Sequence, residues 1–226
     1  MKHKKTVSPS AIIKIDAFWK WFKKNRIEIE NALQNEENAE IVLKSIRKKI
    51  AQISKCVGFV LKTPKMYDRS FFTFIFTVGG QLKKARWAIA FENQAPIVPN
   101  WEIQALVQPC EDLEVIKSGN DKPIKNHDFE LKTSEMYFDL IDYDIYKRTI
   151  SIIVYLQNYK YHYDNEYMMQ TAHIALIELI GEVAYSKSLS NIQLAEIPVK
   201  IVDLVPLYEL PQYIVLIKNS NRKLKI

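Results

Sequence analysis

The densest group of carboxylates in this chain is Asp139, Asp142 and Asp144. Carboxylates bind a metal ion or act as an acid–base pair when they converge within a few ångströms. The surrounding apolar residues predict a strand, whose alternation places Asp142 and Asp144 on one face and Asp139 on the other. Because that is also the pattern of a solvated strand end, we predict no metal and no cofactor.

No other arrangement typical of an active site is visible in the sequence. The four histidines form no paired metal motif, and the late serines lack the Gly-x-Ser-x-Gly turn of a nucleophile. Gly79-Gly80, between a predicted strand and helix, could hold an anion but has no phosphate-loop neighbours. Cys56 and Cys110 stand far apart, and we expect both to be unpaired. An enzyme whose site is built from scattered residues stays an alternative, which a deep pocket with several shifted pKa values would support.

The candidate binding residues are cationic side chains near the N-terminus. Residues 1–90 hold 19 Lys/Arg against 7 Asp/Glu, whereas residues 91–217 hold 9 against 19. A basic face of this kind could bind the phosphates of nucleic acid or an acidic protein, or it could be a solvated face that complements the acidic part of the chain. No helix-turn-helix or RNA-binding motif accompanies it. The candidates are Lys20, Lys23, Lys24, Arg26, Arg47, Lys48, Lys49 and Lys55.

Two predicted helices carry these side chains. Apolar residues recur three, four and seven apart through residues 15–33 and again through 39–53, which predicts a helical hairpin over residues 10–55. A basic arm, residues 1–9, precedes the hairpin and is expected to be flexible. Serine at position 8 or 10 could cap the first helix.

The remainder of the chain predicts an α+β fold. Residues 57–197 are expected to form one mainly antiparallel sheet, with helices near 81–93 and 165–180 packed on one face. Residues 110–128 are the best loop candidate, and a short strand is expected at 183–189 or 192–197. A helical segment, 203–217, and a basic tail, 218–226, complete a single domain spanning residues 1–226.

Four tyrosines alternate along one segment of the predicted sheet. On a strand they would share a face, where they could stack bases or anchor a partner if exposed. Strand aromatics usually pack, so we expect burial. The residues are Tyr155, Tyr159, Tyr161 and Tyr163.

Short motifs in the chain resemble a group of uncharacterised bacterial proteins. The motifs are Phe18-Trp-Lys-Trp-Phe, Pro99-Asn-Trp-Glu leading into Ala105, and Leu179-Ile-Gly-Glu. The resemblance spans most of the chain and implies the same order of elements. It implies no activity, because the group carries none.

The sequence favours a non-catalytic binding or accessory protein that recognises a macromolecular partner, expected to be a protein, through the basic helices. Nucleic-acid binding by the same helices is the alternative. No stretch reaches the roughly 20 apolar residues of a membrane helix, so no membrane partner is expected. The two isolated cysteines are in keeping with a cytoplasmic location. The sequence leaves the oligomeric state open.

Overall fold

The structure is a computed structural model that describes residues 6–35, 38–64, 71–127, 129–199 and 204–220. The chain divides into two compact units, Met1–Val107 and Gln108–Ile226. Both combine helices with sheets, which confirms the predicted α+β class. The sequence predicts a single domain spanning residues 1–226, and this stays a prediction. Residues 1–5 of the predicted arm and 221–226 of the predicted tail lie outside the described residues.

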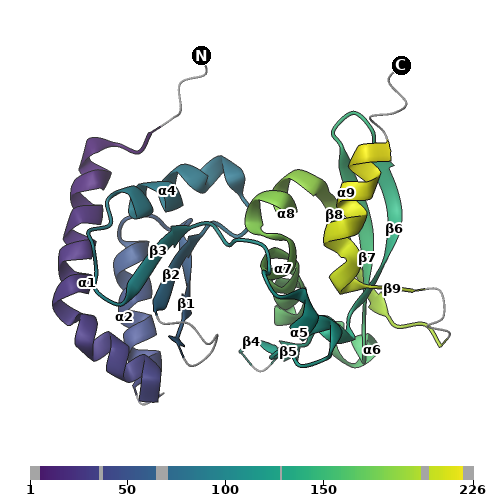
Figure 1. The fold of residues 1–226 in the computed structure, drawn as a ribbon, viewed down its shortest axis with the longest axis horizontal. Helices are drawn as coiled ribbons and strands as arrows, with labels where there is room; N and C mark the ends of the chain where they lie inside the picture. Colours follow the sequence, from purple (N-terminus) through teal and green to yellow (C-terminus); the bar gives the residue numbers. More distant parts are fainter. Residues whose placement is uncertain (1–5, 36–37, 65–70, 128, 200–203, 221–226) are drawn as a thin grey trace. The chain divides into compact units, whose positions relative to one another are not determined.

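The first unit packs helices against a three-stranded sheet of order β1-β2-β3 (Figure 1). Strand β2 is antiparallel to β1 and parallel to β3, because α4 returns the chain to the same end of the sheet. The elements are α1 (Pro9–Asn35), α2 (Ala39–Ala51), β1 (Gly58–Lys62), β2 (Phe72–Thr77), α4 (Ala85–Asn93) and β3 (Trp101–Ala105).

An aromatic core joins α1 to the sheet. The predicted apolar stripe of α1 is buried, and Phe18 meets Phe74, Phe76 and Phe91 edge to face. The Trp19 Nε1–H group donates to the carbonyl of Phe91 at 2.8 Å, which satisfies both polar groups within the core. The predicted helical hairpin is therefore confirmed, and α1 is fixed by contacts that are far apart in sequence.

The structure also shows which of the two candidate serines caps α1. The Ser8 hydroxyl accepts from the backbone N–H of Ala11 at 3.3 Å, and the Ser8 carbonyl accepts from the same N–H at 3.0 Å. Ser8 therefore caps α1. Pro9 is the first helical residue, a position where the missing N–H of proline has no cost.

The second unit holds a four-stranded sheet of order β8-β7-β6-β9 and a separate hairpin, β4-β5 (Figure 1). Its central pair, β6 and β7, is antiparallel, and β8 lies parallel to β7. Its strands are β4 (Ile124–Asn126), β5 (Phe129–Leu131), β6 (Tyr137–Asp144), β7 (Thr149–Leu156), β8 (Leu189–Glu196) and β9 (Val205–Pro206). Its helices are α5 (Leu113–Lys117), α6 (Tyr159–His162), α7 (Glu166–Ile180), α8 (Glu182–Ser188) and α9 (Leu210–Ser220).

Burial alternates along β7, as expected for a sheet covered on one face. Ile150, Ile152, Val154 and Leu156 are buried in one cluster with side chains of α7 and α9. The opposite face of the same strand is only half-buried. Helices on one face of the sheet were therefore predicted correctly for this unit.

Several expectations are wrong. The described parts of residues 57–197 form three sheets rather than one. Most strand pairs are antiparallel as expected, but helical crossovers make β2–β3 and β7–β8 parallel. The expected loop at 110–128 contains α5 and β4, with Asp112 capping α5 through hydrogen bonds from two backbone N–H groups. Residues 183–189 lie mostly in α8, so the alternative strand near 192–197 is the correct one. Residues 218–220 of the expected tail extend α9.

The tyrosine prediction fails for two of the four residues, whereas Tyr155 on β7 and Tyr159 are half-buried. Strand β7 ends at Leu156, and the chain turns through Asn158, whose φ of 58° is left-handed, into α6. Tyr161 and Tyr163 are consequently 81% and 69% exposed rather than buried on a strand face.

Candidate functional site

Three of the predicted basic residues lie together on the outer face of α1. Lys20, Lys23 and Lys24 are exposed and stand three and four positions apart, so their side chains are neighbours on the helix surface. None forms an ion pair with a carboxylate of the described residues, although Asp16 and Glu28 occupy positions four residues away. Unpaired ammonium groups at this density make the outer face of α1 positive.

Arg26 has a structural role instead. It is half-buried, donates to the Pro99 carbonyl at 3.1 Å and lies 3.7 Å from Glu30. The same Glu30 carboxylate accepts from the Trp101 indole at 2.8 Å. These contacts tie α1 to the start of β3.

The basic residues of α2 point in different directions. Arg47 and Lys49 are two positions apart and therefore lie on opposite sides of the helix. Arg47 and Lys48 are exposed, whereas Lys49 is half-buried beside α1, with its Nζ atom 4.7 Å from the centre of the Trp21 ring. Lys55 is exposed in the turns that follow α2. The structure thus groups the eight predicted residues unevenly rather than on one continuous face.

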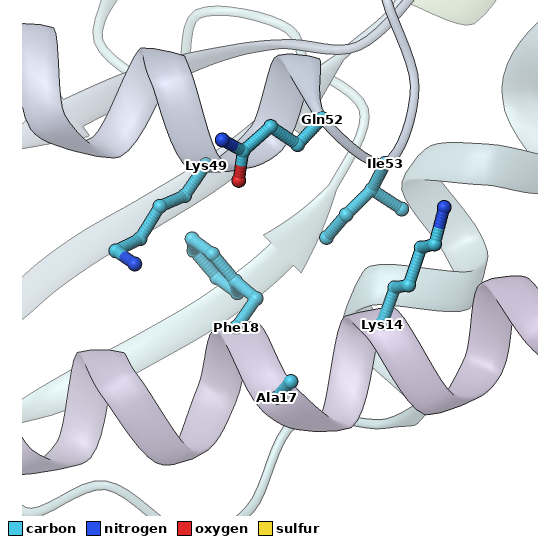
Figure 2. Close-up of a pocket in the computed structure, with 6 residues that line it drawn as sticks. All are labelled: Lys14, Ala17, Phe18, Lys49, Gln52 and Ile53. Carbon is cyan, nitrogen blue, oxygen red and sulfur yellow. The ribbon is translucent and has the colours of Figure 1, made fainter.

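A groove of about 270 Å³ separates α1 from α2. In Figure 2 the Phe18 ring projects from α1 toward α2, and the ammonium groups of Lys14 and Lys49 lie on its two sides. Ala17 and Ile53 complete an apolar floor, and the Gln52 amide lies on the α2 side. None of the six lining residues is acidic.

Burial and charge define what the groove can accept. Phe18 is only 3% exposed, so it presents the edge of a buried ring and not a free face for stacking. The cation–π contact between Lys49 and Trp21 holds the ammonium at the rim, where water still solvates it. The groove can therefore take one apolar group with negative charge beside it.

Sequence reasoning missed Lys14, Gln52 and Ile53. Lys14 precedes Phe18 by four residues, a spacing that places both on one side of α1 and could have signalled the site. Gln52 and Ile53 follow the last residue of α2; the apolar periodicity through residue 53 included Ile53 but did not indicate a groove, and it gave no role to Gln52. The groove depends on the angle at which α1 and α2 meet, and the apolar pattern of neither helix predicts that angle.

The acidic cluster differs from its prediction. Asp139, Asp142 and Asp144 oppose Ile153, Ser151 and Thr149, which share one face of β7, so all three aspartates share a face. A β-bulge at Ile141 causes the change, because an extra residue reverses the alternation after Leu140. Within the described residues no three His, Cys, Asp or Glu side chains could hold a metal ion together.

Hydrogen bonds engage the last aspartate of that cluster. The Asp144 carboxylate accepts from the backbone N–H of Lys147 at 2.9 Å and from its ammonium at 3.1 Å, and these bonds lower the pKa of Asp144. Asp139 accepts from the adjacent Leu140 N–H at 2.7 Å. These are turn and strand-end contacts rather than a catalytic pair.

The second unit holds several groups with shifted pKa values, among them Lys218, whose pKa is lowered by burial and by Lys187 and whose ammonium donates to the Ser188 hydroxyl at 2.7 Å. Burial lowers the pKa of His173 and raises the pKa of Tyr185, whose hydroxyl lies 3.2 Å from the His173 Nδ1 atom. Neither lines the larger cavity of about 380 Å³, which includes Lys117, Lys132 and Tyr208. In that cavity the hydrogen bond from Lys117 to Glu114 raises the pKa of Lys117. Of the groups with shifted pKa values, Lys117 lines this cavity and His173, Tyr185 and Lys218 do not.

Two further observations bear on the type of protein. No helix within the described residues combines the length and the apolar character that crossing a membrane requires. Comparison with protein-family models, with curated proteins and with solved structures finds no match to this chain. The residues that line the groove between α1 and α2 are therefore the basis for inferring its function.

Proposed function

We propose that this chain is a binding protein whose first unit recognises an acidic segment of a protein partner through the groove between α1 and α2. The observation that carries the proposal is an apolar floor, Phe18 with Ala17 and Ile53, flanked by the ammonium groups of Lys14 and Lys49. An apolar side chain with carboxylates on both sides complements such a groove. The lysines on the outer face of α1 would steer the partner toward it.

Charge pairing elsewhere in the chain supports this assignment. Some lysines have local partners, such as Lys44 with Glu40 at 2.7 Å in the same helix α2 as Lys49, and Lys117 with Glu114 at 2.9 Å in α5. Lys14 and Lys49 have no such ion pair among the described residues. Exposed ion pairs contribute only about 0–1 kcal/mol each, so unpaired lysines around a groove are better explained by a partner than by stability.

The size of the groove favours a side chain over a cofactor. Its volume of about 270 Å³ is below the range typical of small-molecule sites, which begins near 300 Å³. The buried Phe18 ring offers no face on which a nucleobase could stack, unlike the platforms of single-strand binders. A protein partner is therefore preferred to nucleic acid, and a cytoplasmic location belongs to the same proposal.

The test measures fluorescence anisotropy with two labelled probes: an acidic peptide with one central leucine, and single-stranded DNA of similar charge. We expect the peptide to bind, and the double variant Lys14→Gln/Lys49→Gln to weaken its affinity about tenfold through loss of two rim charges. The matched control is Lys83→Gln/Lys84→Gln, which removes two exposed lysines of the same unit outside the groove. It should change the affinity by less than about twofold.

Three results would contradict the proposal. Equal weakening by both double variants would mean that only net charge matters. A peptide with serine in place of leucine that binds equally well would remove the role of the apolar floor. Tighter binding of the DNA, with an affinity that falls steeply with salt, would support the nucleic-acid alternative instead.

A further inference from the structure

The two edges of the four-stranded sheet differ in how they are protected. Strand β9 covers one end of β6 by pairing with Tyr137 and Phe138. The remainder of β6 carries the bulge at Ile141 and the three aspartates described above. Bulges, charges and short covering strands are the usual means by which proteins prevent an edge strand from pairing with another chain.

The opposite edge, β8, has few of these features. Its eight residues, Leu189–Glu196, include no lysine, arginine or proline, and the only charge is Glu196 at the end. That carboxylate is already engaged by the Lys160 backbone N–H at 2.8 Å. A bulge at Ser190 is confined to the start of the strand, and Asn191–Glu196 pair with β7 in regular register.

The outer edge of β8 has no strand partner in the part of the chain that the structure describes, since β8 pairs there with β7 alone and otherwise contacts the helices α6 and α8. Alternate residues of an edge strand direct N–H and C=O groups away from the sheet, where they can bond a further strand. Ile192 and Leu194 pack against the core of this unit and are still only half-buried. An added strand would cover their outer sides as well.

We propose that β8 pairs with β8 of a second copy of this chain, antiparallel about a two-fold axis at Gln193, to join two four-stranded sheets into one. In this register Ile192 lies opposite Leu194 of the second copy on the helix-covered face. Asn191 lies opposite Ala195 on the other face, and Gln193 meets its own equivalent. A shift by one residue would place apolar side chains opposite polar ones, so the alternation restricts the register.

The charge pattern of the two edges favours self-pairing of β8, with a second copy as the occupant. Self-pairing of β8 brings no two like charges together, because Glu196 falls opposite the uncharged Ser190. Self-pairing of β6 would bring aspartates together, which destabilises a strand pair. A two-fold contact uses the same edge on both copies, so assembly closes at a dimer and leaves no open β8 edge.

The experiment is sedimentation of the full chain over a range of concentrations. We expect a dimer of twice the 26.5 kDa chain mass. Gln193 is exposed, so Gln193→Lys and Gln193→Glu should fold, and each should raise the dimer dissociation constant about fivefold or more by opposing like charges. An equimolar mixture of the two variants should dimerise again, because lysine then faces glutamate.

A matched control is Gln212→Lys, an exposed glutamine on α9, which should leave the dissociation constant unchanged. Circular dichroism of each variant checks its folding, and the mixture keeps the test valid if one variant is less stable. A monomeric native chain would overturn the proposal. So would a dimer that is insensitive to both Gln193 variants, or a mixture that dimerises no better than its components.

Discussion

Replacing Gly181 with alanine should destabilise the second unit more than any other glycine substitution in it. Gly181 ends α7 and begins α8 with φ 79° and ψ 149°, a region of backbone space that is nearly restricted to glycine. A Cβ atom there would lie 2.8 Å from both the backbone nitrogen and the Cδ atom of Pro109. Backbone strain of about 1–3 kcal/mol adds to the displacement of Pro109, so we expect a loss of about 3–4 kcal/mol.

The matched control is Gly119→Ala. Gly119 also has a positive φ, 73°, but a Cβ atom would meet nothing within 4 Å, so only the strain of about 1–2 kcal/mol applies. With a urea dependence of about 1–3 kcal/mol per molar, Gly181→Ala should lower the unfolding midpoint by about 1–4 M and the control by clearly less. Equal shifts for the two variants would refute the importance of the Pro109 contact.

Following the urea unfolding of Gly181→Ala with two optical probes also tests whether the chain unfolds as one domain. All four tryptophans, Trp19, Trp21, Trp87 and Trp101, belong to the first unit, whereas far-UV circular dichroism sees both units. If the chain unfolds as the single domain predicted from the sequence, Gly181→Ala shifts both transitions together. If the units unfold separately, the tryptophan transition stays in place while the dichroism signal changes.

Three further substitutions test individual interactions. Trp19→Phe removes the buried indole donor and leaves the Phe91 carbonyl unpaired, so urea unfolding should show a loss of about 2–3 kcal/mol; an unchanged midpoint would contradict this. Asp112→Ala removes the cap of α5 and should cost about 1 kcal/mol in the same assay. Burial lowers the pKa of His173, so the unfolded chain binds more protons and the free energy of unfolding should rise as pH increases toward about 6.5. His173→Gln should flatten that pH dependence, and an unaltered slope would contradict the assignment.

The helices were the most predictable part of the fold. In α1 and α2 every third or fourth residue is apolar, and a stripe of this kind specifies both the helix and its buried face without knowledge of its neighbours. The apolar residues of β7 likewise predicted a strand, although only its burial alternates, because Ile152 to Leu156 are all apolar or aromatic. Gly181 was also identifiable as the end of α7, because glycine is favoured where a helix stops.

What the sequence did not reveal depends on pairing between distant segments. One extra residue at Ile141 moved Asp139 to the face of Asp142, and no local pattern distinguishes a bulge from a regular strand. Parallel pairing of β7 with β8 requires the chain to return through α7 and α8, and α8 itself resembled a strand in its apolar content. The groove next to Phe18 likewise arises from two helices meeting, so only Lys49 among its residues was predicted.

The uneven distribution of charge along the chain coincides with its division into two units. The first unit holds 19 Lys/Arg against 9 Asp/Glu, and the second holds 13 against 17, so the basic excess belongs entirely to the first unit. Pairs of opposite charge within a unit would stabilise its folded state slightly. An excess of one charge sign instead causes repulsion among the charged groups, which destabilises the folded state. An excess that opposes folding is retained most readily where it serves association. The unpaired lysines of α1 and of the groove expose part of that excess, and other exposed lysines and arginines of the first unit, such as Arg47 and Lys83, expose more of it.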